Sequence, residues 1–252
     1  MIQRLLGMGL NVVAIDWRGQ GMSDRVNPDP LIGHVKEFAD YQQDVQAMLA
    51  HPRVQAQPGP RILMAHSMGG CIGLRALING LDVQRAVFSA PMFAIRTPVL
   101  LRPFEGLIMK FALARGMQQD RLVATGLAAY VLESKFQNNL LTNDRDTWDM
   151  MVAHLEAKPE LRIGGPSFGW IDAAKRESKS LAEATLPDLP ILTFMGDQEK
   201  VVSKAAIRST VARMPNGQLQ ECAGAKHEIW MEKPATQTAV WQQIRDFLHP
   251  LW

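Results

Sequence analysis

The sequence predicts an α/β fold in which a mostly parallel sheet is flanked by helices and interrupted by a helical insertion. Over residues 1–91, short apolar runs alternate with stretches of helical periodicity. Strand signals are then absent over residues 92–188, and they resume from residue 189 onward. We therefore expect a core formed by residues 1–91 and 189–252, with residues 92–188 inserted as a helical cap.

The first part of the core predicts three strands and two helices. Residues 11–15 form a continuous apolar run, which is typical of an interior strand of a parallel sheet. Residues 61–65 and 85–89 are two further runs of this kind. Apolar residues at helical spacing predict helices over residues 1–10 and 34–50.

The insertion and the last part of the chain complete the pattern. Strands are predicted at residues 191–195 and 218–222, followed by a closing amphipathic helix at residues 234–248. The helices predicted in the insertion span residues 104–115, 121–135, 146–158 and 170–185.

Composition excludes several classes of protein. With 252 residues, 47% of them hydrophobic, the chain can bury a large core. A formal charge of +2 without a basic stripe argues against nucleic acid as a partner. Cys71 and Cys222 lie far apart, which favours two reduced thiols in a cytoplasmic protein. No apolar run reaches the roughly 20 residues of a membrane helix, so any membrane contact is expected to be peripheral.

One short motif points to catalysis. Residues 65–70, Ala-His-Ser-Met-Gly-Gly, follow the apolar run 61–64 and precede a helix-like stretch at residues 71–79. A strand, a sharp turn, Ser67 and a helix form a nucleophile elbow, which holds the serine in a strained conformation. Ala65 and Gly69 satisfy the need for small residues on either side, where we expect larger side chains to collide with their neighbours. The alternative is a serine that caps an ordinary helix.

The later strands deliver the groups that a serine nucleophile needs. A serine hydroxyl requires a base to take its proton and an acid to orient that base. His227 follows the strand at 218–222, and both Asp197 and Glu199 follow the strand at 191–195. The chain order of serine, acid and histidine is that of the α/β-hydrolases, unlike the orders in chymotrypsin and subtilisin.

Other motifs predict neither a cofactor nor a metal ion. The glycine pairs at residues 7–9 and 19–21 lack the third glycine of a dinucleotide loop. His66 is interpreted as a packing residue, because neighbouring side chains on an elbow point in different directions. The remaining histidines, which have no metal-ligand spacing, are His34, His51, His154 and His249.

These motifs together identify a family. Over essentially its whole length the chain resembles the lysophospholipase and monoacylglycerol-lipase branch of the α/β-hydrolases. In that family the acid stands three residues after a strand-end glycine, which selects Glu199 and leaves Asp197 as the fallback. The backbone N–H of Met68 is then the expected oxyanion donor. The resemblance rests on residues 16–23, 65–70, 89–92, 139–142, 164–167, 196–202 and 227–228, with Trp170 and Glu232.

The resemblance implies a serine carboxylic-ester hydrolase that acts on a single-chain lipid, either a lysophospholipid or a monoacylglycerol. Ser67 would be the nucleophile, His227 the base and Glu199 the orienting acid of an acyl-enzyme mechanism. The cap is expected to roof the serine, to enclose an apolar pocket for one acyl chain and to offer a peripheral contact with a membrane. Two alternatives remain, a hydrolase of small soluble esters or aminoacyl substrates and a catalytically impaired fragment. The oligomeric state is left open.

The resemblance also predicts a gap in the sheet. Related hydrolases have further strands before the point where this chain begins, and a His-Gly loop among them supplies the second oxyanion donor. We therefore expect an N-terminally incomplete chain. Residues 11–15 would then be separated from the strand at 61–65 or would pair with it directly. Loss of one oxyanion donor costs on the order of 10²–10³ in turnover.

Overall fold

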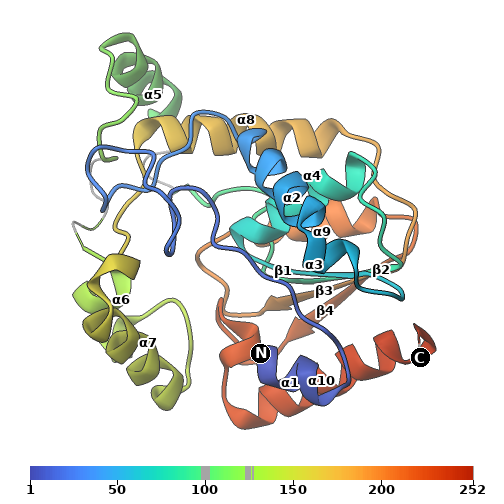
Figure 1. Ribbon diagram of the computed structural model, residues 1–252. Helices are drawn as coiled ribbons and strands as arrows, with labels where there is room; N and C mark the ends of the chain where they lie inside the picture. The colour runs from blue at the N-terminus through green and yellow to red at the C-terminus, as the bar shows by residue number, and fades with distance from the viewer. Residues whose placement is uncertain (98–102, 123–125, 127, 252) are drawn as a thin grey trace.

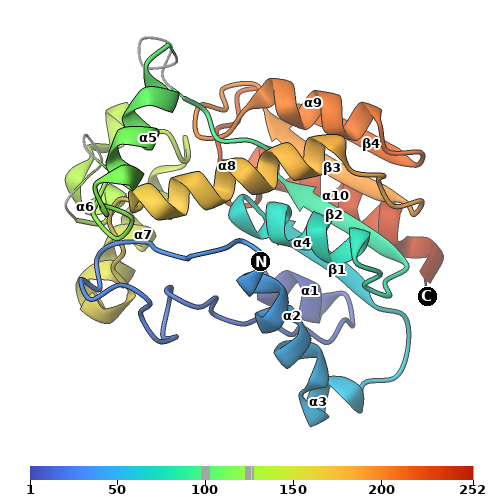
Figure 2. The ribbon, with the colours of Figure 1, turned by 90° about the horizontal axis from the view of Figure 1, so that it is seen from above.

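The computed structural model describes residues 1–97, 103–122, 126 and 128–251. The chain forms a layered α/β structure, with one sheet between two layers of helices (Figure 1). Three further helices lie at one end of this core in both views (Figures 1 and 2).

The sheet has four parallel strands, in the order β1-β2-β3-β4. They are β1 (Ile62–His66), β2 (Arg85–Ser89), β3 (Ile191–Gly196) and β4 (Gly217–Cys222). Every residue of β3 is buried, whereas β4 is exposed or half-buried, as expected for an interior strand and an edge strand. Because the strands are parallel, the loops that follow them all lie at the C-terminal ends of the strands. The candidate site is formed by these loops.

Helices cover both faces of the sheet (Figure 1). On one face lie α2 (Asp40–Ala50), α3 (Pro52–Gln55), α4 (Met68–Ile78), α8 (Phe168–Glu183) and α9 (Lys204–Ala212). On the other lie α1 (Ile2–Gly7) and α10 (Pro234–Leu248). The end of the core carries α5 (Glu105–Ala114), α6 (Tyr130–Glu133) and α7 (Arg145–Ala157). Short 3₁₀ helices are η2 (Phe136–Asn138), η3 (Pro159–Leu161), η4 (Ile229–Met231) and η5 (His249–Leu251).

Helix α8 connects the inserted helices to the core. Its first turns contribute Phe168 and Ile171 to a small apolar cluster with Met109 and Ala112 of α5. Further along, Leu181 belongs to the main core. An ion pair between Arg75 Nε of α4 and Glu177 Oε1 of α8, 2.6 Å long, ties the same helix to the layer above the sheet. The insertion is therefore anchored along the length of one helix.

The strand predicted at residues 11–15 is not formed, and this prediction is wrong. These residues have no regular structure and are exposed or half-buried. They do not pair with β1, and a cavity of about 1110 Å³ is lined by both segments. An extended apolar segment becomes a strand only where a neighbouring strand satisfies its backbone groups. Here β1 is an edge strand, and the separation expected between the two segments is present.

Three predicted helices differ from the structure in their extent. The helix predicted at 121–135 is helical only at Tyr130–Glu133, and residues 123–125 and 127 lie outside the described part. The helix predicted at 1–10 ends at Gly7. The helix predicted at 34–50 begins at Asp40.

The late start of α2 has a structural reason, because the preceding residues pair with the segment before α8. Gly33 forms a bridge with Pro166, and the Ser167 N–H donates to the Gly33 carbonyl at 2.9 Å. His34 Nδ1 lies 2.7 Å from Ser167 Oγ.

Helix α9 was not predicted.

Both cysteines are free. No helix in the described part of the chain is long and apolar enough to cross a membrane.

Candidate active site

Ser67 stands in the sharp turn between β1 and α4. Its backbone has φ 51° and ψ −120°, a region that residues other than glycine rarely adopt. The Ser67 N–H donates to the Ser89 carbonyl at 3.0 Å, and the Ser67 carbonyl accepts from the N–H groups of Gly70 and Met92 at 2.9 and 2.8 Å. The end of β2 therefore holds the strained turn in place.

The tight packing expected at Gly69 is found at Gly70 instead. Among the described residues, a Cβ on Gly69 would come no closer than 4.0 Å to Ala65, which is ordinary contact. A Cβ on Gly70 would overlap Pro91. A small residue is needed at Gly70 because α4 passes close to the loop after β2 there. The same loop restrains Ser67 through the Met92 N–H.

Ser67, His227 and Glu199 form one chain of hydrogen bonds. His227 Nε2 lies 2.9 Å from Ser67 Oγ, and His227 Nδ1 lies 2.7 Å from Glu199 Oε2. An ionised carboxylate only accepts hydrogen bonds, so Nδ1 carries a proton and donates a hydrogen bond to Glu199. In the neutral ring Nε2 is then an acceptor for the Ser67 hydroxyl proton. This is the tautomer that a general base requires.

Glu199 is a buried carboxylate with both oxygens engaged. Its side chain is inaccessible to solvent, and Oε1 accepts from the N–H groups of Val201 and Val202. Burial alone would raise its pKa, but the hydrogen bond and charge of His227 and the two backbone donors lower it below its ordinary value. The carboxylate therefore stays charged at neutral and mildly acidic pH. Asp197 is exposed, and its hydrogen bonds within the described part of the chain are made by its backbone.

The loop that carries His227 is held by backbone contacts and by a second buried acid. Glu232 is 1% exposed, and its Oε1 accepts the Lys226 N–H at 2.8 Å. The Gln198 N–H donates to the Ala225 carbonyl at 3.0 Å. Gly196 lies so close beneath the loop that a Cβ there would overlap the carbonyl oxygens of Ala225 and Lys226. The position of His227 is thus determined by the end of β3 and by Glu232.

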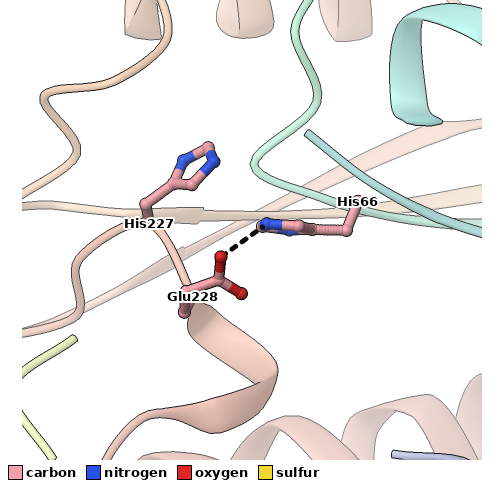
Figure 3. A group of neighbouring side chains, drawn as sticks. All are labelled: His66, His227 and Glu228. Carbon is pink, nitrogen blue, oxygen red and sulfur yellow. Dashed lines mark ion pairs between the residues drawn. The ribbon is translucent and has the colours of Figure 1, made fainter. Parts of the chain in front are cut away.

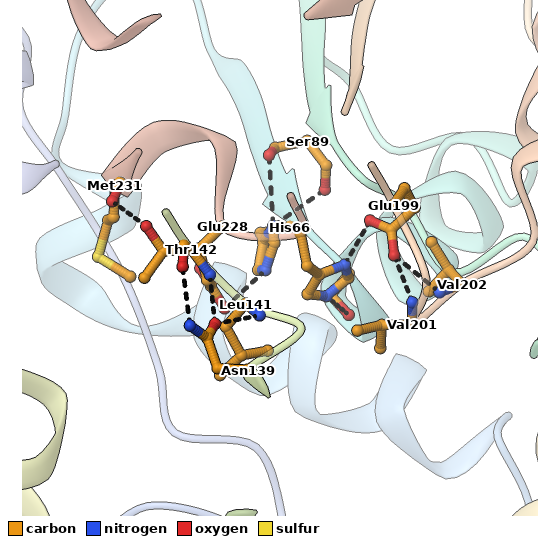
Figure 4. A network of polar contacts seen from close by, with 12 residues as sticks. His66, Ser89, Asn139, Leu141, Thr142, Glu199, Val201, Val202, Glu228 and Met231 are labelled. Carbon is orange, nitrogen blue, oxygen red and sulfur yellow. Dashed lines mark hydrogen bonds and ion pairs between the residues drawn. The ribbon is translucent and has the colours of Figure 1, made fainter. Parts of the chain in front are cut away.

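A segment of the insertion docks onto the same loop, as Figure 4 shows. Asn139 is buried and closes its own turn, with Oδ1 accepting the N–H groups of Leu141 and Thr142. The Leu141 carbonyl accepts the Glu228 N–H at 2.8 Å, and Thr142 Oγ1 donates to the Met231 carbonyl. Residues 139–142, which carried part of the family resemblance, therefore position the insertion against the His227 loop.

The backbone N–H of Met68, the predicted oxyanion donor, lies at the start of α4 next to Ser67. Met68 is the first residue of α4, so its N–H has no acceptor within the helix. It makes no hydrogen bond to another described residue. The N-terminus of a helix also carries partial positive charge, which favours a developing anion beside Ser67.

Ser67 and His227 open onto the cavity of about 1110 Å³, and its walls are mainly apolar. The expectation that the cap encloses this cavity is wrong. Among the described residues of the insertion, only Leu141 lines it, and the other walls come from the core. The cavity lies at the unpaired edge of β1. Residues 11–15 are separated from this strand, and side chains of both segments line the space between them.

His66 is more than the packing residue predicted for it. Its Nε2 lies 3.3 Å from Glu228 Oε1, and its Nδ1 lies 3.0 Å from the Ser89 carbonyl (Figure 3). The nitrogen and oxygen atoms of His66, His227 and Glu228 lie within 4.8 Å of one another, a spacing that a metal ion could bridge. Both ring nitrogens of His227 already have partners, so we interpret this cluster as a His66–Glu228 ion pair that lies beside His227. The sequence could have indicated this pair only through position, because His66 precedes Ser67 and Glu228 follows His227.

The fold and this arrangement of residues define a serine hydrolase of the α/β-hydrolase fold. The profile of the serine aminopeptidase S33 family matches residues 1–234, and the chain belongs to this family. Within the α/β-hydrolases it falls in the lysophospholipase and monoacylglycerol-lipase branch.

Two curated relatives and two solved structures illustrate this placement. Lysophospholipase L2 of Escherichia coli K12 is 31% identical over 260 residues, which cover 97% of this chain and 74% of the relative. A probable lysophospholipase L2 of Haemophilus influenzae is 28% identical, over 96% of this chain and 75% of the relative. A monoacylglycerol lipase of Paleococcus ferrophilus has a TM-score of 0.70 at 20% identity, covering 98% and 87% of the two chains. A monoglyceride lipase of Saccharomyces cerevisiae has a TM-score of 0.65 at 19% identity, covering 94% and 77%.

Gly196→Ala tests whether the end of β3 positions His227. The new methyl group overlaps two carbonyl oxygens of the loop, so the loop must shift. We expect the rate at which an organophosphorus reagent modifies Ser67 to fall by about 100-fold. Gly106→Ala is the control, because Gly106 faces open space within α5. A Gly196→Ala variant that reacts as fast as wild type would contradict this account.

Proposed function

We propose that this protein is a serine carboxylic-ester hydrolase that acts on single-chain lipids, either lysophospholipids or monoacylglycerols. The observation that carries the proposal is the hydrogen-bond chain from Ser67 through His227 to Glu199, built on a strained turn at the end of a strand. Membership of the S33 family supports the reaction type. The names of the lysophospholipase L2 relatives support the choice of a lipid ester.

The geometry supports a two-step mechanism. Ser67 Oγ attacks the ester carbonyl as His227 Nε2 takes its proton, and the oxyanion that forms faces the Met68 N–H. His227 then gives the proton to the leaving alcohol, which leaves an acyl-enzyme on Ser67. A water molecule repeats the sequence, with His227 again as the base, and releases the fatty acid. Glu199 keeps Nδ1 protonated and stabilises the imidazolium that forms in each step.

The cavity beside Ser67 suits an apolar acyl group better than a peptide N-terminus. Its walls are mainly apolar, which is the environment that an acyl chain seeks. An aminopeptidase would need a carboxylate available for the substrate ammonium group. Glu228 is the one acid among the described residues that line the cavity, and it is paired with His66. Small soluble esters and aminoacyl substrates remain the second candidate because the family description includes aminopeptidases.

The insertion offers a surface for a lipid bilayer. Met109 and Ala112 of α5 face inward, while the opposite side of the helix is apolar and open to solvent. Lys110 and Arg115 are exposed beside this face, and the Arg115 guanidinium lies over the Phe111 ring. An apolar helix face bordered by cations suits a bilayer that contains anionic phospholipids. The exposed side chains are Phe104 at 58%, Leu107 at 70%, Ile108 at 42% and Phe111 at 56%.

A fluorophosphonate probe followed by substitution of the two candidate acids tests the mechanism. We expect the probe to label Ser67 and no other serine. Glu199→Ala should lower kcat on a short-chain nitrophenyl ester by about 10³- to 10⁴-fold, because the histidine loses its orienting partner. Asp197→Ala is the matched control and should change kcat little. Folded protein that resists the probe, or equal losses in the two variants, would contradict the assignment.

Comparison of one-chain and two-chain lipids tests the substrate class. Hydrolysis of a lysophospholipid, followed by release of fatty acid, should be faster than hydrolysis of the diacyl phospholipid with the same head group. Monoacylglycerol should be cleaved as well. Equal rates on one-chain and two-chain lipids, or a preference for aminoacyl naphthylamides, would overturn the lipid assignment.

Leu107→Glu tests the contact with a membrane. The substitution places a charge in the exposed apolar face of α5, and we expect co-sedimentation with phosphatidylglycerol vesicles to weaken about tenfold. Turnover of a small soluble ester should be unchanged. Leu6→Glu is the control, because Leu6 of α1 is 53% exposed on a different helix. Equal weakening by both substitutions would show that α5 is not the contact surface.

A further inference from the structure

A second histidine–glutamate pair lies directly beside the first. His66 immediately precedes Ser67, and Glu228 immediately follows His227. The 3.3 Å contact between His66 Nε2 and Glu228 Oε1 therefore joins the nucleophile turn to the histidine loop. Figure 3 shows the pair reaching across from the two segments, with His227 above it.

The other ring nitrogen of His66 is tied to the backbone that holds Ser67. His66 Nδ1 lies 3.0 Å from the Ser89 carbonyl and 3.3 Å from Ser89 Oγ. The same carbonyl accepts the Ser67 N–H. With both nitrogens facing acceptors, the ring fits best as an imidazolium that donates to the Ser89 carbonyl from Nδ1 and forms an ion pair with Glu228 through Nε2, a contact without hydrogen-bond geometry.

The charges around His66 favour this state. Burial lowers the pKa of His66, but the charge and hydrogen bond of Glu228, the Ser89 carbonyl and the charge of Glu199 together raise it above its ordinary value. Burial raises the pKa of Glu228, and the charge and hydrogen bond of His66 and the charge of His227 lower it overall. The titratable groups that face the His66 ring are Glu228, Glu199 and His227, whose ring centroid lies 4.8 Å away. Both shifts favour the ionised form of the pair.

We propose that His66 and Glu228 are positioning residues, which set the distance between Ser67 and His227 and keep the Glu228 carboxylate away from the His227 ring. The inference rests on the proposed hydrolase function of the same site. A Glu228 carboxylate oxygen lies within 4.8 Å of a His227 ring nitrogen, so rotation of the Glu228 side chain would bring it into competition with Ser67 for the ring. His66 prevents this by binding the carboxylate. The nucleophile and its base are therefore aligned through the residues next to them.

The pair predicts a pH dependence with a defined sign. Because the pKa of His66 is raised in the folded state, the ion pair is complete below the ordinary value of 6.5 and is lost as pH rises through the raised pKa. Wild-type kcat should therefore fall on the alkaline side as the ring loses its proton. A variant without the pair should lack this fall.

A double-mutant cycle tests the proposal. We expect Glu228→Gln to lower kcat on a short-chain nitrophenyl ester by about 10- to 100-fold, with KM nearly unchanged. His66→Gln should be slower still, because it leaves the Glu228 carboxylate unpaired beside His227. The double variant should then recover to the level of Glu228→Gln. Glu228→Asp, which keeps the charge, should retain more activity than Glu228→Gln.

The control is Glu221→Gln, which removes a comparable ion pair with Arg208 on the surface of α9 and β4. It should leave kcat and its pH profile unchanged. A Glu228→Gln variant with wild-type kcat and a wild-type alkaline limb would overturn the proposal, as would a change confined to KM. A double variant slower than His66→Gln would also contradict it.

One readout separates this proposal from the proposed function. An NMR titration follows the His66 ring without any substrate, and its pKa should fall in Glu228→Gln. If wild type neither labels with a fluorophosphonate nor cleaves esters, the hydrolase function fails even where this pKa falls. If wild type is active and the His66 pKa is unchanged in Glu228→Gln, the ion pair fails while the hydrolase function stands.

Discussion

The site depends on a single backbone constraint, the strained conformation of Ser67 between β1 and α4. A conformation with φ 51° costs of order 1–3 kcal/mol in a residue with a side chain, and it persists only where the surroundings restrain it. The restraint comes from the end of β2, where the Ser89 carbonyl and the Met92 N–H bind the backbone on either side of the serine. Because β2 pairs with both β1 and β3, the same strand end relates Ser67 to the segment that carries Glu199.

His227 lies on a loop that is held by contacts from outside the sheet as well as by the sheet. Glu199 orients the ring from the end of β3, while Glu232 and residues 139–142 of the insertion hold the backbone on either side. The buried carboxylates of Glu199 and Glu232 each accept backbone N–H groups, and Glu199 also accepts from His227 Nδ1. The insertion thereby contributes to the position of His227.

The free edge of β1 shapes the surroundings of the site. Residues 11–15 carry the composition of an interior strand, yet they lie apart from β1 and leave apolar side chains facing a large cavity. The cavity beside Ser67 is therefore lined mainly by the core, with Leu141 as the contribution from the described part of the insertion. An apolar wall next to the hydrogen-bond chain excludes water and strengthens the electrostatic contacts among Ser67, His227 and Glu199.

The sequence by itself determined the class of fold, the four strands of the sheet, the turn at Ser67 and the partners Glu199 and His227. The fold class, the strands and the turn follow from local patterns, since a strand followed by a small-residue turn and a helix places a serine at a strand end. The choice of Glu199 over Asp197 followed from the resemblance to the family. The tertiary structure alone decided that residues 11–15 form no strand, that Gly70 and not Gly69 meets the close approach, and that His66 pairs with Glu228. All three depend on which backbone or side chain arrives from elsewhere in the chain, because hydrogen-bond partners and close contacts between distant segments leave no periodic signal in the sequence.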